Sequence, residues 1–388
     1  MDRYDDATRL IASATKRGQG RRPVNPPIER ASTMLSDRVG DMRDMSLGPV
    51  YGLDGTAPLN ALRLLVADLE RGLGSIVLPS GLAALTLPIL TFGRPGDDIV
   101  VSDAVYGPTR RFLTRWAASQ GIRTCFHPAR ATADEILAIC SETTRMVIIE
   151  SPSSLTFDMI DVPKLAAGLR DRKILSLMDN TWGAGLAFRP LEHGIDISMQ
   201  ALTKYASGHS DVLMGSATTA DTTLLARMMQ TYEDLGWHVS PDDAWLVLRG
   251  MRTLPVRFGH QAQSALTVAA WLSGRNEIAQ LMYPALPGDP GHDLWSRDYK
   301  GAAALFGIVL NGGDDAAAER FLESLTLFGL GYSWGGFESL ATLETGQVAR
   351  RNDPPSLAGP LLRLHIGLEH PDDLISDLEA GLRTLEGR

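Results

Sequence analysis

Ala201-Leu202-Thr203-Lys204 and Met178-Asp179-Asn180-Thr181-Trp182 are the two segments that decide the fold of this chain. Each lies at the end of an apolar run, and Lys204 comes 25 positions after Asp179. A lysine that follows a hydroxyl residue can form a Schiff base while the hydroxyl reaches a phosphate. An aspartate at the end of a buried strand can hold a pyridinium nitrogen in its protonated form. The two segments therefore predict one cofactor that is held at both of its ends.

Pyridoxal 5'-phosphate is the cofactor that fits these segments, because its protonated ring is an electron sink. Each residue taken alone has a more ordinary explanation. A lysine is usually solvated, and an acid at the end of a strand is as often a cap of the following turn. The prediction therefore depends on the joint pattern of Lys204, Asp179 and the apolar residues that precede them.

The chain from 56 to about 220 alternates strand-like apolar runs with amphipathic helical patterns such as 61–73 and 108–120. Strand, helix and strand in this order predict βαβ units, and hence an α/β domain with a mostly parallel sheet. The strands are expected at 75–79, 98–102, 146–150, 174–178 and 195–201.

The two ends of the chain have different patterns. Residues 1–55 are interrupted by prolines and have no sustained apolar period, which predicts an extended N-terminal arm. After a long helical region, 242–271, broken near Pro255, the tail predicts strands and helices in an α+β order. We expect the strands at 304–310 and 361–366, the helices at 315–327 and 372–385, and a surface loop at 284–299. This organisation predicts a large domain, 56–250, and a smaller C-terminal α+β domain, 251–388.

Other candidate site residues follow predicted strands, where ligands bind in open α/β sheets. Gly81 and Leu82 open a helix, so their amides could bind a phosphate, although a serine cap with a tight turn explains the same pattern. Tyr106 could stack on the cofactor ring or be a tyrosine of the core or rim. Arg363 lies between apolar residues of a strand, where it could clamp a substrate carboxylate or pair with a neighbouring acid.

Composition excludes several classes of function. The 388 residues carry a net charge of -9, which argues against nucleic acid and anionic membranes as partners and favours small metabolites. Two cysteines and scattered histidines indicate neither a disulfide framework nor a metal site. The charged N-terminus is unlike a signal peptide, and no apolar run is long enough for a membrane span, so we expect a cytoplasmic protein.

The chain resembles the Cys/Met-metabolism family of pyridoxal-phosphate enzymes over nearly its whole length. The motifs that carry this resemblance occur in the family's order, and they are Val24-Asn25, Glu29-Arg30-Ala31-Ser32, Leu78-Pro79-Ser80-Gly81, Tyr106-Gly107-Pro108, Glu150-Ser151-Pro152, Asp179-Asn180-Thr181-Trp182, Thr203-Lys204-Tyr205, Gly208-His209-Ser210-Asp211, Pro284-Ala285-Leu286-Pro287-Gly288, Tyr332-Ser333-Trp334-Gly335-Gly336-Phe337-Glu338-Ser339 and Leu364-His365-Ile366-Gly367-Leu368-Glu369. Two details favour the family's β-lyase branch. Ser153-Ser154-Leu155 stands where γ-type enzymes show Thr-Asn-Pro, and Trp334 stands where they typically lack tryptophan.

The resemblance implies a fold-type-I architecture with a seven-stranded sheet, and β-elimination of L-cystathionine or a related cysteine S-conjugate. It also implies roles for particular residues. Lys204 would be the Schiff-base lysine and proton shuttle, Tyr106 the stacking residue and Asp179 the pyridinium partner. Gly81, Leu82 and Thr203 would bind the phosphate, and Ser333, Trp334 and Arg363 the substrate. Tyr51 would enter the site of the neighbouring subunit, which implies a homo-oligomer with shared sites, a dimer or a tetramer.

One segment, Tyr51-Gly52-Leu53-Asp54-Gly55-Thr56, departs from the family pattern. Family members carry an arginine two residues after the tyrosine and donate it to the cofactor phosphate of the adjacent subunit. Here Leu53 replaces that arginine, and Asp54 follows it. Ala201 also stands where many relatives have serine. These changes leave two alternatives open: a γ-elimination, γ-replacement or side-chain-exchange enzyme, and a cofactor-binding regulatory protein with weak catalysis.

Overall fold

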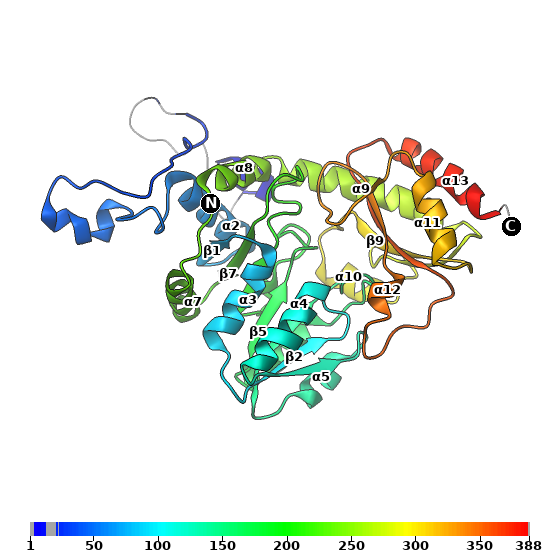
Figure 1. Ribbon diagram of the computed structural model, residues 1–388, viewed down its shortest axis with the longest axis horizontal. Helices are drawn as coiled ribbons and strands as arrows, with labels where there is room; N and C mark the ends of the chain where they lie inside the picture. Colours follow the sequence, from blue (N-terminus) through cyan, green and yellow to red (C-terminus); the bar gives the residue numbers. More distant parts are fainter. Residues whose placement is uncertain (1–3, 13–20, 22, 387–388) are drawn as a thin grey trace.

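The computed structural model describes residues 4–12, 21 and 23–386, and it places two sheets side by side with helices packed around them (Figure 1). The first sheet has seven strands in the order β1-β7-β6-β5-β4-β2-β3. Its strands are β1 (Gly74–Leu78), β2 (Asp98–Ser102), β3 (Arg123–His127), β4 (Thr144–Glu150), β5 (Leu175–Asp179), β6 (Ile197–Gln200) and β7 (Gly215–Thr219). Only β7 is antiparallel to its neighbours, so the predicted seven-stranded, mostly parallel sheet is confirmed.

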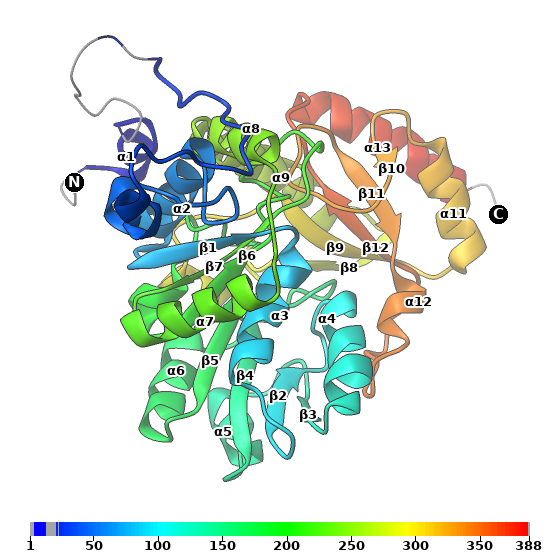
Figure 2. The ribbon, with the colours of Figure 1, turned by 60° about the vertical axis from the view of Figure 1, so that its left-hand side comes forward.

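The strands of the large sheet are buried on both faces because helices cover both sides. In β2, Val100 packs into one core while Ile99 and Val101 pack into the other. Helices α3 and α7 lie on one face of the sheet (Figure 2). The helices around this sheet are α2 (Ala57–Glu70), α3 (Gly81–Phe92), α4 (Gly107–Phe112), α5 (Ala133–Ile139), α6 (Val162–Asp171), α7 (Thr222–Asp234) and α8 (Pro241–Met251). A π-helical turn, Leu113–Ala117, extends α4.

Two strands of this sheet were not predicted. β7 has the sequence Gly-Ser-Ala-Thr-Thr, whose small polar residues give no apolar signal although all five are buried. β3 lies at the sheet edge and has the sequence Arg-Thr-Cys-Phe-His, which lacks a clean alternation. The sheet supplies the stabilisation that these local sequences do not, because strand propensity depends strongly on context.

The second sheet has five strands in the order β10-β11-β12-β9-β8, with α9, α11 and α13 on its outer side (Figure 2). Its elements are α9 (Leu254–Ser273), β8 (Ile278–Met282), α10 (His292–Asp298), β9 (Leu305–Leu310), α11 (Asp315–Ser324), β10 (Gly329–Leu330), β11 (Leu340–Leu343), α12 (Thr345–Val348), β12 (Leu361–His365) and α13 (Pro371–Glu386). The predicted strands and helices of the tail are present. The domain boundary near residue 250, which falls at the end of α8, stays a prediction.

The helical region 242–271 breaks near Pro255, as predicted: the break falls at Arg252 and Thr253, and the proline takes the second position of α9, where its nitrogen needs no hydrogen-bond partner. One local prediction was wrong. The expected loop 284–299 contains α10, whose Leu294 and Trp295 pack against the core. Tertiary packing therefore overrides the high content of proline, glycine and aspartate in this segment.

The N-terminal arm begins later than predicted. Residues of α1 (Asp6–Ala12) pack on α2 and α9, and Leu10 is only 1% exposed. Asp6 forms ion pairs with Arg71 and Arg189 of the large domain. A helix of seven residues is too short to show a periodic signal, so it could not be predicted from the sequence. The segment from residue 23 to 55 projects from the body, with short helical turns at Val39–Arg43 and Met45–Leu47 (Figure 1).

Candidate active site

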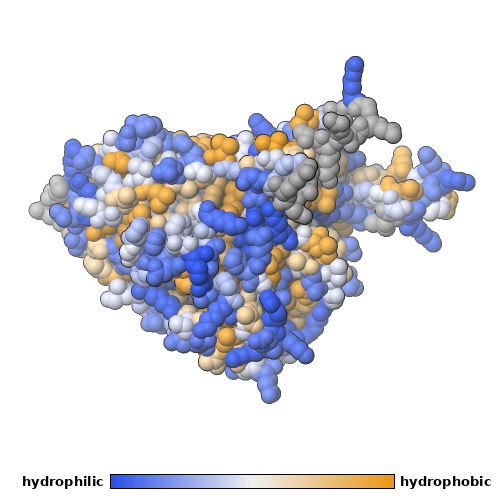
Figure 3. Space-filling view, turned by 180° about the vertical axis from the view of Figure 1, so that it is seen from behind, coloured by the Kyte–Doolittle hydropathy of each residue, from blue (hydrophilic) through white to orange (hydrophobic). Residues whose placement is uncertain are grey.

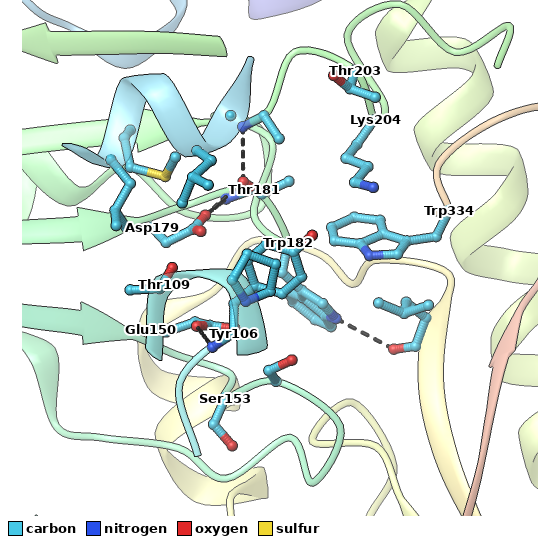
Figure 4. Close-up of a pocket in the computed structure, with 18 of the residues that line it drawn as sticks. Tyr106, Thr109, Glu150, Ser153, Asp179, Thr181, Trp182, Thr203, Lys204 and Trp334 are labelled. Atoms are coloured by element: carbon cyan, nitrogen blue, oxygen red, sulfur yellow. Dashed lines mark hydrogen bonds between the residues drawn. The ribbon is translucent and has the colours of Figure 1, made fainter. Parts of the chain in front are cut away.

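A cavity of about 310 Å³ opens at the carboxyl ends of the parallel strands. Its floor comes from the ends of β4 and β5 and from the turn that follows β6, and the first turn of α3 lies at one side. Trp334 and Arg363 of the second sheet region close the other side. Figure 4 shows Lys204 reaching toward Trp334, with Asp179 on the opposite side of the cavity.

Asp179 is the last residue of β5, and its carboxylate lies in the cavity floor. Its Oδ1 accepts hydrogen bonds from the Thr181 amide at 3.0 Å and the Thr181 hydroxyl at 2.5 Å. The Thr181 hydroxyl oxygen accepts in turn from the Ala201 amide at 2.9 Å, which joins β5 to the segment of Lys204. Burial raises the pKa of Asp179, although Thr181 and Lys204 act in the opposite direction. Such a carboxylate is stabilised by a cationic partner.

Lys204 projects into the cavity from the turn after β6. Its Nζ donates a hydrogen bond to the Ser333 hydroxyl at 2.7 Å and lies 5.2 Å from the centre of the Trp334 ring. Burial lowers the pKa of Lys204 to about 8, and the nearby Arg363 adds to this effect while Asp179 opposes it. The charged form still predominates near pH 7, but the neutral form, which acts as a nucleophile or base, is far more populated than in a lysine exposed to water.

Arg363 lies on β12 and reaches the same wall of the cavity as Ser333. Its Nη2 donates to the Ser333 carbonyl at 3.2 Å, and its Nη1 lies 3.9 Å from a carboxylate oxygen of the buried Glu344. Both alternatives predicted for this arginine thus have a structural counterpart, an acid partner and an open cavity. Ser333 has a φ of 89°, a conformation that costs energy in a residue other than glycine and is often found at functional sites.

His365 holds the loop that carries Ser333 and Trp334. The Gly335 amide donates to its Nε2 at 3.0 Å, while its Nδ1 lies 3.1 Å from the Ala304 carbonyl. Burial lowers the pKa of His365 to about 4. The imidazole therefore stays neutral near physiological pH and provides a constant acceptor behind the cavity wall.

The first turn of α3 approaches the Lys204 segment closely. A Cβ atom at Gly81 would lie 2.6 Å from the Ala201 Cβ, so only glycine fits at this position. The Ser80 hydroxyl accepts from the Ala83 amide, which confirms the alternative of a serine cap. The amides of Gly81 and Leu82 belong to the first turn, where helical amides have no intrahelical acceptor, and both residues line the cavity. An anion could therefore bind at this point.

Tyr106 lies at the cavity mouth and is attached to the floor through its backbone. Its amide donates at 2.8 Å to Glu150, the last residue of β4, which pairs with Asp179 in the sheet. Burial, together with the neighbouring Asp179, raises the pKa of Glu150 well above its usual range. Glu150 is a site residue that was not predicted from the sequence. Its position as a strand-end acid, like that of Asp179, was the signal that could have found it.

The sequence pattern of the family described as Cys/Met metabolism PLP-dependent enzyme matches residues 7–383. The chain belongs to this family. Its cofactor is therefore pyridoxal 5'-phosphate, PLP, as the segments of Lys204 and Asp179 predicted.

Relatives in the family cover almost the whole chain. A cystathionine beta-lyase of Bordetella avium is 40% identical over 371 residues, which are 94% of this chain and 93% of that protein. A cystathionine beta-lyase of Escherichia coli is 35% identical over 389 residues, which are 97% and 98% of the two chains. The crystal structure of a cystathionine gamma synthase from Xanthomonas oryzae pv. oryzae in complex with cystathionine matches with a TM-score of 0.91, 30% identity and 99% coverage of both chains. The predicted family and fold are confirmed.

The cavity of this family member fits PLP. A half-buried carboxylate, Asp179, lies opposite a half-buried amine, Lys204, and each suits a different end of the ring. The close approach of Gly81 to Ala201 brings the open amides of α3 beside the segment that ends at Lys204. These groups would hold the ring nitrogen, the aldehyde carbon and the phosphate, respectively.

Nine of the ten predicted site residues come together in this structure. Those that line the cavity are Gly81, Leu82, Tyr106, Asp179, Thr203, Lys204, Trp334 and Arg363, and Ser333 touches Lys204. Tyr51 is not among the residues that line the cavity, and it is 53% exposed on the arm. The roles assigned to these residues stay predictions.

The segment of Tyr51 shows why an acid follows Leu53. The Asp54 carboxylate accepts the Tyr51 amide at 2.8 Å, and the Asp54 amide donates to the Tyr51 carbonyl at 3.0 Å. The Asp54 carbonyl also accepts from Arg63 of α2 at 2.9 Å. Asp54 therefore fastens a turn at the base of the arm. Leu53 is half-buried beside it.

Proposed function

We propose that this protein is a PLP-dependent carbon-sulfur β-lyase acting on L-cystathionine or a related cysteine S-conjugate. The observation that carries this proposal is that the two sequence details typical of β-lyases meet in one cavity. Ser153, Ser154 and Leu155 line one wall, and Trp334 lines another beside the Lys204 amine. Relatives named cystathionine beta-lyase support the same assignment.

When bound, PLP supplies an aldehyde carbon for the substrate amine and a ring that withdraws electrons from the substrate Cα. Asp179 would hold the ring nitrogen protonated, and that positive charge would stabilise the carboxylate. The Gly81 and Leu82 amides would hold the phosphate together with Thr203, whose hydroxyl in this structure bonds to the amide and carbonyl of Met214. Tyr106 would stack on the ring.

Lys204 is the residue that moves the proton of the substrate Cα. As a neutral amine, it removes the proton from the substrate Cα, and the Cβ–S bond then breaks with its electron pair leaving on sulfur. Ser333 and Arg363 orient the substrate carboxylate so that the Cα–H bond faces Lys204. With L-cystathionine and one water the products are homocysteine, pyruvate and ammonia.

Identifying the products tests this function directly. Purified protein is incubated with L-cystathionine, other cysteine S-conjugates and O-acyl-homoserines, and the products are identified by mass spectrometry. Pyruvate with homocysteine supports the β-lyase, and a Lys204→Ala protein provides the blank. One alternative is a γ-elimination or γ-replacement enzyme, and Leu53 keeps it open because this residue replaces an arginine that contacts the phosphate in the family. Formation of 2-oxobutyrate or of a new thioether would indicate a γ-elimination or γ-replacement enzyme instead, and no turnover with any amino acid would indicate a regulatory protein.

We further propose that the protein is a homo-oligomer in which Tyr51 completes the site of the adjacent subunit. The arm that carries Tyr51 projects from the body, and Figure 3 shows hydrophobic side chains along it. Mixing Lys204→Ala chains with Tyr51→Phe chains tests this arrangement. One intact site per mixed dimer, and thus recovered activity, is expected only if the two residues come from different subunits. Heterodimers that form without recovering activity would contradict a shared site.

A further inference from the structure

Glu70 is a buried acid for which the proposed reaction has no direct use. It is the last residue of α2, is 1% exposed and is not among the residues that line the cavity. Burying a carboxyl group costs free energy unless hydrogen bonds compensate for the lost water. Hydrogen bonds from the neighbouring strands compensate for this cost.

Three side chains from two neighbouring strand regions donate hydrogen bonds to Glu70. Asn180 donates to its Oε1 at 3.1 Å, Gln200 donates to the same oxygen, and the Ser198 hydroxyl donates to its Oε2 at 3.0 Å. Asn180 directly follows β5, whereas Ser198 and Gln200 belong to β6. One carboxyl group thus connects the ends of two adjacent strands.

Asn180 and Gln200 are sequence neighbours of residues in the cavity floor. Asn180 is the next residue after Asp179, and Gln200 is the residue before Ala201 and lies four positions before Lys204. On the cavity side, the Thr181 hydroxyl already joins Asp179 to the Ala201 amide. Glu70 therefore ties together, from behind, the same two segments that Thr181 ties together in front.

We propose that Glu70 is a positioning residue that sets the placement of Asp179 relative to Lys204, and hence the geometry with which PLP is held at both ends. This inference rests on the proposed site and adds a residue that touches neither substrate nor cofactor. An error of 1 Å in such a placement is enough to change rates by large factors.

The hydrogen bonds from the three donors distinguish a positioning role of Glu70 from a role in packing alone. A neutral Glu70 can donate from Oε2 to the Ser198 hydroxyl oxygen while Oε1 still accepts from Asn180 and Gln200. Burial raises the pKa of Glu70 to about 7, against the effect of these hydrogen bonds and of Arg189, whose own guanidinium pairs with Asp6. A glutamine at position 70 reproduces the neutral arrangement, whereas a methionine of similar size leaves two buried amide donors unsatisfied.

The experiment compares Glu70→Gln and Glu70→Met proteins with the wild type. Binding of PLP to the apoproteins is titrated, and the circular dichroism of the visible band of the bound cofactor reports its orientation. We expect E70Q to retain the wild-type spectrum and affinity within about twofold. E70M is expected to bind PLP at least about tenfold more weakly, with a reduced visible dichroism and a lower kcat at little-changed KM.

Several outcomes are decisive. E70M with wild-type affinity and spectrum would overturn the proposal, as would an E70M protein that is only less stable to denaturant. If E70M does not fold, Gln200→Met, which removes one of the two donors from β6 and leaves Ser198 in place, should give a smaller loss of dichroism, and an unchanged spectrum would overturn the proposal. Wild-type protein that binds no PLP at Lys204 would instead contradict the proposed function, so the two failures are distinguishable.

Discussion

The cavity floor and the N-terminal arm solve opposite physical problems. In the floor, Asp179 and Glu150 are half-buried carboxyl groups whose pKa values are raised by burial. On the arm, apolar side chains stand in water, with Leu35 95% and Val39 85% exposed. Each arrangement is unfavourable in the isolated chain. We expect a binding partner to stabilise each one.

The missing component differs between the two regions. The cavity floor requires a small ligand that carries both a cationic nitrogen and an anionic phosphate, because its carboxylate and its open amides have opposite preferences. For the arm we expect apolar surface of a second copy of the chain, since exposed apolar patches often mark interfaces. Changes in the floor should therefore affect cofactor chemistry, and changes in the arm should affect assembly.

The largest effect is expected at Lys204. Replacing it with alanine removes the amine that transfers the Cα proton, so kcat should fall by at least about a thousandfold. The readout is pyruvate release from L-cystathionine. Lys164→Ala is the matched control, because Lys164 forms an exposed ion pair with Asp134 and lies outside the cavity lining. Equal losses in both variants would contradict a special role for Lys204.

Charged substitutions on the arm should weaken assembly of the oligomer. Leu35→Asp combined with Val39→Asp places two carboxylates where we expect apolar contacts worth about 1.5–3 kcal/mol each. The dissociation constant of the oligomer, measured by sedimentation velocity, should rise at least about a hundredfold. Leu235→Asp, an exposed change at the end of α7, is the control. An unchanged assembly would show that the arm does not form the interface.

The sequence predicted the parts of the fold that carry strong periodic signals. The apolar runs of β2, β4 and β5 and the amphipathic pattern of α13 were found with small shifts at their ends. It failed at β7, where small polar residues are buried by their neighbours, and at α10, which is stabilised by packing. Local sequence cannot reveal an element whose stability comes mainly from distant parts of the chain.

The candidate site shows the same limit. Lys204, Asp179 and Tyr106 were identifiable because each follows a strand, so that topology alone brings them to one edge of the sheet. Glu150 was not identified although it ends a strand as Asp179 does; its hydrogen bond to the Tyr106 amide joins residues 44 positions apart. Glu70 ends a helix and carries no such signal, and its hydrogen bonds to Asn180 and Gln200 join residues 110 and 130 positions apart, which no spacing rule predicts.

The cost of burying Lys204 can be measured without any turnover. In the apoprotein, Lys204→Met removes an ammonium whose pKa is lowered from 10.5 to about 8, so the free energy of unfolding at pH 7 should rise by up to about 3 kcal/mol. Between pH 8 and 10.5 the unfolded wild type binds a proton that the folded protein does not, so wild-type stability rises with pH and the difference shrinks. Urea denaturation at pH 7 and pH 10 checks both values. Lys164→Met is the control, and a difference independent of pH would contradict the burial of charge.

The smallest effect is expected where the arm and the cavity floor meet, at Leu53. Leu53→Arg restores a cation beside the phosphate of the adjacent subunit, if the arm reaches that site. A charge-assisted hydrogen bond contributes about 1.5–3 kcal/mol. Ordering the arginine side chain offsets part of this gain, so PLP should dissociate about tenfold more slowly. Asp54 is kept, because its carboxylate fastens the turn through the Tyr51 amide. Loss of visible absorbance during dialysis gives the rate, and Leu64→Arg, on an exposed face of α2, controls for added positive charge. Equal rates in wild type and Leu53→Arg would mean that the amides of α3 and Thr203 hold the phosphate without help from the arm. The cavity floor would then bind the cofactor independently of the arm.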